Sequence, residues 1–104
     1  MIVPIEKIFL RNTKAEKEPW HHKHSPFYRK VRDSIKKQGK IINPLICIET
    51  NEHEGKPYKC YMGNNRFLAA LELGYKEVPI KIVTDYSDKN LRAEVEKYIP
   101  VEYV

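Results

Sequence analysis

Apolar residues along the chain fall into short runs of strand length, separated by polar turns. The run at 45–50 is apolar at almost every position, which is typical of a strand covered on both faces of a sheet. A polar turn containing Gly55 separates it from the run at 58–62, and this spacing predicts a β-hairpin. Because Pro4 removes a backbone donor, the first strand is expected at a sheet edge. The predicted strands are a short one within 1–8, which Pro4 interrupts and a turn follows, and those at 45–50, 58–62 and 78–83.

A four-residue period replaces the strand pattern after residue 25. Ser25 can cap a helix, Pro26 suits its first position and Gly39 is a typical stop. Two shorter helices are predicted over 66–73 and 87–98. The side chains of the first helix that we expect to face the core are Phe27, Val31 and Ile35.

The segment 11–24 has no periodicity and few apolar side chains. A loop of this length in a small domain is usually functional or disordered. The predicted order is therefore strand, loop, helix, strand, strand, helix, strand, helix. That order indicates an α+β fold with a small mixed sheet, and residues 1–104 are expected to form a single domain.

Composition and charge narrow the class of protein. The chain is 41% hydrophobic and 32% charged, which is a globular balance. It has no apolar run of the roughly 18 residues that a membrane helix needs, and its start does not resemble a signal peptide. Cys47 and Cys60 lie in strand-like sequence and are expected to be buried, reduced packing residues. We therefore expect a cytoplasmic protein with no membrane contact.

The formal net charge of +5 is concentrated in one part of the chain. Between residues 7 and 40 there are eleven Lys and Arg against three acidic residues. Such a surface favours polyanions, so DNA is a candidate partner through non-specific backbone contacts. The alternative is a solvated helix face with no partner. The candidate nucleic-acid contacts are Arg29, Lys30, Arg32, Lys36, Lys37 and Lys40.

The turn after the strand at 58–62 carries the most specific chemistry. Gly63 lets the backbone turn sharply, and the helix that follows offers unpaired N–H groups and a positive dipole end. Arg66 adds a forked cation, and Asn64 and Asn65 add amide donors. Together these residues predict a cradle for phosphate or carboxylate. The alternative is a tight turn with Arg66 on the surface.

The larger pattern resembles the ParB/sulfiredoxin domain family, also known as the ParB-like nuclease domain. The match runs over 31–83, and the opening segment Val3–Ile8 looks like the family's first strand and turn. The matching pieces are Ser34-Ile35, Gly39, Asn43-Pro44-Leu45, Gly63-Asn64-Asn65-Arg66-Phe67-Leu68-Ala69-Ala70, Gly74-Tyr75 and Val78-Pro79-Ile80.

The resemblance implies nucleotide binding at the Gly63–Arg66 turn. ParB proteins bind CTP there, sulfiredoxins bind ATP and related free-serine kinases use ADP. Asn64 and Asn65 match neither the ParB nor the sulfiredoxin version of the turn, so the nucleotide stays open. The absence of a cysteine in the turn argues against sulfiredoxin chemistry. No helix-turn-helix, dimerisation domain or ParB clamp sequence is expected in these 104 residues, so sequence-specific DNA binding is not implied.

Two further groups of residues are weaker candidates. Trp20 stands beside three histidines, and the family places this segment as a loop over the turn; a polar loop without a ligand is the alternative. No metal site is predicted, because metal-ligand spacing is missing there. Glu6 and Glu18 are the candidate carboxylates for holding Mg²⁺ or acting as a base. The three histidines of the loop are His21, His22 and His24.

Three hypotheses for function follow. The first is a stand-alone ParB-like domain that binds a nucleotide or phosphate ligand and acts with DNA, as in a phage or mobile-element accessory protein. The second is an enzyme on the same site, either a Mg²⁺-dependent nuclease or a small-molecule phosphotransferase. The third is a protein-interaction module with a vestigial pocket. Ligand binding without turnover favours the first hypothesis.

Overall fold

A computed structural model describes residues 1–12, 16–18, 20 and 23–83 of the protein. The helical elements whose bounds fall wholly within these residues are η1 (Ile5–Lys7, a 3-10 turn), α3 (Pro26–Gln38) and α4 (Asn64–Glu72). The predicted helix over 87–98 lies outside the described residues. The strands are β1 (Ile2–Pro4), β2 (Ile8–Leu10), β3 (Leu45–Glu49), β4 (Tyr58–Met62) and β5 (Glu77–Ile82).

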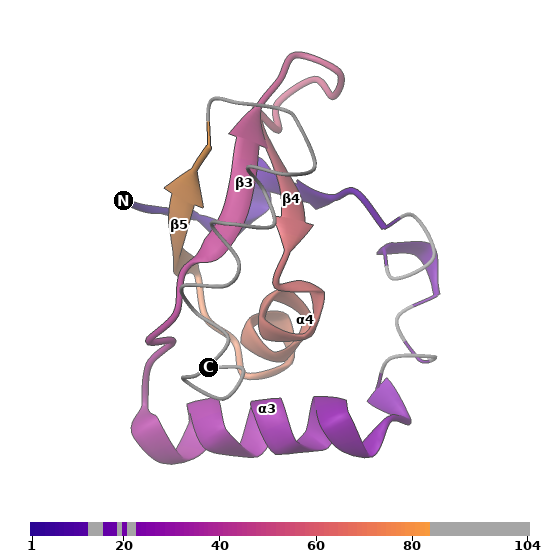
Figure 1. Ribbon diagram of the computed structural model, residues 1–104, viewed down its shortest axis with the longest axis vertical. Helices are drawn as coiled ribbons and strands as arrows, with labels where there is room; N and C mark the ends of the chain where they lie inside the picture. The colour runs from indigo at the N-terminus through magenta and orange to yellow at the C-terminus, as the bar shows by residue number, and fades with distance from the viewer. Residues whose placement is uncertain (13–15, 19, 21–22, 84–104) are drawn as a thin grey trace.

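The five strands form one mixed sheet in the order β1-β5-β3-β4-β2. β3 and β4 form the predicted antiparallel hairpin, while β3 pairs with β5 and β2 pairs with β4 in parallel. β1 pairs with β5 in the antiparallel direction. Figure 1 shows α4 between the sheet and α3, at the end of β4. The predicted α+β class with a mixed sheet is confirmed, and its central hairpin places α4 directly after β4.

The N-terminal segment differs in part from the prediction, which was a short edge strand within 1–8 that Pro4 interrupts before a turn. It forms two short strands separated by η1, and these strands lie at opposite edges of the sheet. β1 ends at Pro4, and the backbone N–H of Ile5 donates to Lys76 O at 2.9 Å, at the next position in the register of β1 with β5, before the chain continues into η1. Figure 1 shows this segment passing behind β3 and β4. The edge position of β1 was predicted, and β2 was missed.

Helix α3 begins and ends where its sequence indicates. The Ser25 side chain accepts a hydrogen bond from Phe27 N at 3.1 Å, and Gly39 closes the helix in the left-handed conformation. The buried side of α3 is formed by Tyr28, Val31 and Ile35, whereas Phe27 is 41% exposed. The predicted core stripe was therefore wrong at its first position. Tyr28 is buried instead because its hydroxyl reaches helix α4.

Both faces of β3 are buried, as its continuous apolar sequence predicted. Leu45 and Cys47 belong to the main core, which lies between the sheet and the two helices. Ile46 and Ile48 belong to a second, smaller cluster with Val83. In the segment 11–24, the described positions include helical turns, with His24 N donating to Trp20 O at 3.1 Å. None of the helices in the described ranges combines the length and apolar character needed to cross a membrane.

Candidate functional site

The turn between β4 and α4 is built on Gly63. Its φ of 115° lies in the region that only glycine adopts readily. A Cβ at this position would lie 2.5 Å from Leu45 Cδ2 and 3.2 Å from Arg66 Nη2. Glycine is therefore required here twice, once for the backbone angle and once for the close approach of β3 and of the arginine.

Helix α4 opens at this turn with its first N–H groups directed out of the helix. The first hydrogen bond of the helix runs from Phe67 N to Gly63 O at 2.8 Å, so the N–H groups of Asn64, Asn65 and Arg66 precede the helical ladder. Gly63 has no side chain to cap them. A helix start of this kind attracts an anion through its N–H groups and its dipole.

Arg66 folds back over the start of its own helix. Its Nη1 donates to Asn43 O at 2.8 Å and to Pro44 O at 2.9 Å, and the side chain is partly buried. Its Nη2 lies 3.2 Å from the position that a Cβ on Gly63 would occupy, so the guanidinium lies against the turn. Two carbonyls thus fix the orientation of the cation. These contacts also give Arg66 a structural role, which is compatible with the alternative of a tight turn without a ligand.

Asn43 and Pro44 are the partners that sequence reasoning did not assign to the site. Asn43 is buried with 4% exposure, in the segment between α3 and β3. The run Asn43-Pro44-Leu45 contributed to the family resemblance, but nothing in the sequence pattern indicated that its carbonyls hold Arg66. This contact joins residues 22 and 23 positions apart, so no local spacing reveals it.

The two asparagines of the turn carry buried side-chain oxygens. Asn64 Oδ1 and Asn65 Oδ1 are both inaccessible and have no hydrogen-bond partner among the described residues. A buried polar atom without a partner costs free energy, and in native proteins it usually meets an ordered water or a ligand. The turn therefore contains two buried acceptor atoms whose hydrogen-bonding capacity the described residues leave unused.

The candidate carboxylates differ in exposure. Glu6 is exposed in η1, and Glu18 is half-buried. Glu16, which was not a leading candidate, accepts a hydrogen bond from Leu10 N at the end of β2. No cluster of three or more histidine, cysteine or acidic side chains suited to a metal occurs in the part of the chain that the structure describes.

The aromatic and histidine group is only partly described. Trp20 is 51% exposed, and His24 is exposed and bonded through its carbonyl to Arg29 Nη2 at 3.3 Å. His21 and His22 lie outside the described residues. The position of this loop over the turn, which the family resemblance implies, stays a prediction.

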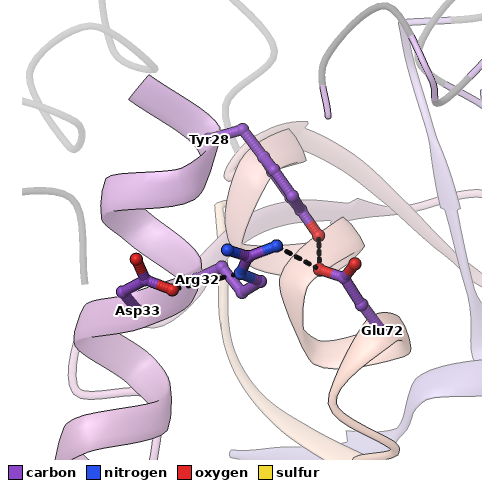
Figure 2. Close-up of polar contacts among 4 residues, drawn as sticks. All are labelled: Tyr28, Arg32, Asp33 and Glu72. Atoms are coloured by element: carbon purple, nitrogen blue, oxygen red, sulfur yellow. Dashed lines mark hydrogen bonds and ion pairs between the residues drawn. The ribbon is translucent and has the colours of Figure 1, made fainter. Parts of the chain in front are cut away.

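The basic surface of α3 divides into paired and solvent-facing cations. Arg32 contacts Asp33 Oδ1 at 3.2 Å and Glu72 Oε2 at 3.6 Å, so its charge is partly neutralised. Tyr28 donates to the same Glu72 oxygen at 2.6 Å, and Figure 2 shows the tyrosine and the arginine converging on it. The exposed cations of α3 are Arg29, Lys30, Lys36 and Lys37, and Lys40 is exposed just after the helix.

The network in Figure 2 shifts the pKa of the buried Tyr28 and of the exposed Glu72. Burial, followed by the bond to Glu72, raises the pKa of the Tyr28 hydroxyl above its usual range. The hydrogen bond from Tyr28 is the main cause that lowers the pKa of Glu72. This network joins α3 to the end of α4, away from the turn at Asn64, so we assign it a structural role.

A surface groove of about 500 Å³ lies elsewhere on the molecule. It is formed by residues from β1, from the end of α3 and from the start of β5, including Ile2, Lys40 and Val78. None of the residues 63–66 lines it. The groove and the turn are therefore separate features.

Known structures share this fold. Sulfiredoxin from Arabidopsis thaliana has a TM-score of 0.57 and 26% identity, covering 91% of this chain and 97% of its own. ParB from Caulobacter crescentus complexed with CTP-gamma-S has a TM-score of 0.62 and 21% identity, covering 97% of this chain and 52% of its own. A free serine kinase in complex with AMP has a TM-score of 0.62 and 18% identity, covering 85% of this chain and 32% of its own.

These similarities differ in extent. The chain spans nearly the whole sulfiredoxin, about half of the truncated ParB and about a third of the kinase. No curated protein sequence matches the chain. The ParB N-terminal domain family matches residues 4–97, which is most of the sequence. The resemblance predicted from the sequence is thereby confirmed, and the chain belongs to the ParB N-terminal domain family.

Proposed function

We propose that this protein binds a nucleotide or another phosphate ligand at the turn Gly63-Asn64-Asn65-Arg66. The observation that carries the proposal is the orientation of Arg66, whose guanidinium is fixed over the start of α4 by the carbonyls of Asn43 and Pro44. A fixed cation beside outward-directed helix N–H groups is complementary to a phosphate. CTP-gamma-S, AMP and ADP in the complexes of similar structures support a nucleotide as the ligand.

The asparagines shape the ligand that the turn can accept. Their side-chain amides add no net charge, so the cationic charge within the turn comes from Arg66. The buried Oδ1 atoms can accept hydrogen bonds from ligand hydroxyl or amino groups, and a rotated amide offers N–H donors to phosphate instead. CTP, ATP and ADP all carry these groups, and Mg²⁺ would accompany their phosphates.

A thermal-shift panel tests this proposal. The ligands are CTP, ATP, ADP, GTP and inorganic phosphate, each with and without Mg²⁺. At about 100 times its dissociation constant a ligand contributes roughly 2.7 kcal/mol to the stability of the native state. For a domain of this size, Tm should rise by on the order of 10 °C.

Two kinds of variant make the panel specific. Arg66→Ala is expected to abolish the ligand-induced shift. Arg66→Ala also removes two hydrogen bonds, so a matched control is needed. The control is Lys59→Ala, which removes a cation that contacts Glu52 at 2.8 Å on the β3–β4 hairpin. The control should lose some stability and keep the full shift. A cooperatively melting wild type that shifts with no ligand would refute the proposal.

We also propose that the exposed lysines of α3, together with Lys40 just after this helix, give the protein a non-specific DNA-binding surface. Lys30, Lys36, Lys37 and Lys40 are exposed, and the similar ParB from Caulobacter crescentus is known in a complex with its centromeric parS site. Binding through phosphate contacts alone weakens steeply with salt. Fluorescence anisotropy on an arbitrary DNA duplex at several salt concentrations measures it.

A further inference from the structure

Cys47 and Cys60 face each other across the central hairpin. They are register partners in the antiparallel pair β3–β4, and both are completely buried. These are the two cysteines of the chain, and both are free in this structure. Their side chains lie in the same core cluster, on the helical side of the sheet.

The backbone hydrogen bonds show which kind of cross-strand pair this is. Cys47 O accepts from Val83 N at 2.9 Å, and Cys60 O accepts from Arg11 N at 2.9 Å. The polar backbone groups of each cysteine therefore point away from the other strand, so the two form a non-hydrogen-bonded pair. In such pairs the Cα atoms are about 4.5 Å apart and the side chains lie close together. This spacing falls within the roughly 4.4–6.8 Å range of disulfides.

We propose that Cys47 and Cys60 are a modification site that forms a reversible intrachain disulfide when a peroxide oxidises one of the thiols. That thiol attacks the peroxide, an S–O bond forms as the O–O bond breaks, and one water leaves. The second thiol then attacks the sulfenic sulfur, an S–S bond forms as the S–O bond breaks, and a second water leaves. Two thiols lose two electrons in total, and hydrogen peroxide is reduced to two waters.

The surroundings of the pair predict a slow reaction. The hydrogen bond with Cys47, followed by burial, raises the pKa of the Cys60 thiol well above its usual value. The Cys60 Sγ also donates to Met62 O at 3.3 Å. A buried, protonated thiol is a poor nucleophile, so oxidation proceeds through local opening of the hairpin. Once formed, the cross-link closes a loop of about 14 residues, from 47 to 60.

The position of the cross-link connects it to the turn at the end of β4. Cys60 precedes Gly63 by three residues, and Cys47 follows Leu45, the side chain in contact with that glycine, by two. The disulfide would therefore tie together the two strands whose ends hold residues 63–66. Its formation depends on strand register and does not require that the turn bind a ligand.

Intact mass and peptide mapping test the assignment. The native full chain is treated with hydrogen peroxide until its free-thiol content stops falling. A mass loss of about 2 Da, reversed by dithiothreitol, is expected. Trypsin cuts after Lys59 but not at the Lys56–Pro57 bond, so the linked product joins the peptides 41–59 and 60–66. Cys47→Ala and Cys60→Ala should each give no such product. A disulfide-linked dimer, addition of oxygen atoms without a cross-link, or two thiols still free would overturn the proposal.

An equilibrium measurement keeps the test independent of reaction rate and of variant folding. The disulfide of the wild-type chain is equilibrated with reduced and oxidised dithiothreitol, once under native conditions and once in concentrated urea. If the native strands hold the cysteines at disulfide distance, the native disulfide should be on the order of 100-fold harder to reduce than the unfolded one. A native disulfide that is equally or more easily reduced would show that the hairpin geometry opposes the cross-link.

Discussion

Gly63→Ala is the change that tests the architecture of the turn most directly. The new Cβ would sit 2.5 Å from Cδ2 of Leu45, which is fully buried and has no open space to move into. The backbone would also hold a non-glycine residue at a φ of 115°. A strained backbone costs about 1–3 kcal/mol, and an overpacked core costs a similar amount. Together they predict a loss of about 4 kcal/mol in the free energy of unfolding.

Urea unfolding followed by far-UV circular dichroism measures this loss, with Gly74→Ala as the matched control. Gly74 has a comparable positive φ of 81° at the other end of α4, but a Cβ there meets nothing within 4 Å. Gly74→Ala should therefore lower the free energy of unfolding only through backbone strain, by about 1–2 kcal/mol. Because the φ of Gly63 is larger than that of Gly74, the difference between the two variants combines the clash with Leu45 and the additional backbone strain at Gly63.

A double-mutant cycle provides the decisive comparison. In a Leu45→Ala background the clashing Cδ2 atom is absent, so Gly63→Ala should cost less there, with a coupling of about 1–2 kcal/mol. Equal losses for the two glycine variants, or an additive cycle, would refute the packing argument. The requirement for glycine at position 63 would then come from the backbone conformation alone.

Three further predictions concern other parts of the molecule. Ser25→Ala should lower stability by about 1 kcal/mol in chemical denaturation, because it removes the cap on Phe27 N, and no change would contradict the role of the cap. Tyr28→Phe should cost about 1 kcal/mol at neutral pH. The pKa of Glu72 is lower in the folded state than in the unfolded state. The ionised Glu72 therefore stabilises the fold at pH values above its unfolded-state pKa, and this contribution is lost as the pH falls through its folded-state pKa. Denaturation curves should therefore converge for wild type and Tyr28→Phe in acid, and a constant gap down to low pH would contradict this. Lys36→Ala with Lys37→Ala should reduce the salt dependence of DNA binding by about one unit of slope per lysine, whereas Lys56→Ala with Lys59→Ala on the hairpin should not.

Much of the fold was predictable because its signals are local. The cap at Ser25, the stop at Gly39 and the continuous apolar run of β3 each act within a few residues, and the structure confirms them. The division of residues 1–8 into β1 and β2 was not predictable in this way. It depends on which strands are available at the two edges of the sheet, and that is decided by residues 58–60 and 77–79 far along the chain.

The same distinction explains the first position of the core stripe in α3. Phe27 and Tyr28 both lie about one helical turn before Val31, so periodicity alone does not determine which of them is buried. Tyr28 is buried because Glu72 on α4 accepts its hydroxyl at 2.6 Å, a partner 44 residues away. A buried tyrosine needs such a partner, and only the packing of α3 on α4 supplies it.

The anchoring of Arg66 changes how the turn should be read. The sequence pattern of Gly63 and Arg66 predicted phosphate binding, but both residues also have a structural role in the fold. Gly63 leaves room for the Leu45 side chain, and Arg66 connects α4 to the carbonyls of Asn43 and Pro44.

Loss of ligand binding in Arg66→Ala alone would therefore not distinguish a lost ligand contact from a disturbed turn. Asn64→Ala and Asn65→Ala separate them, because these side chains have buried oxygens without partners in the described structure. If the turn binds a ligand through them, each change should weaken binding while leaving Tm unchanged or raised, since it removes an unsatisfied buried group.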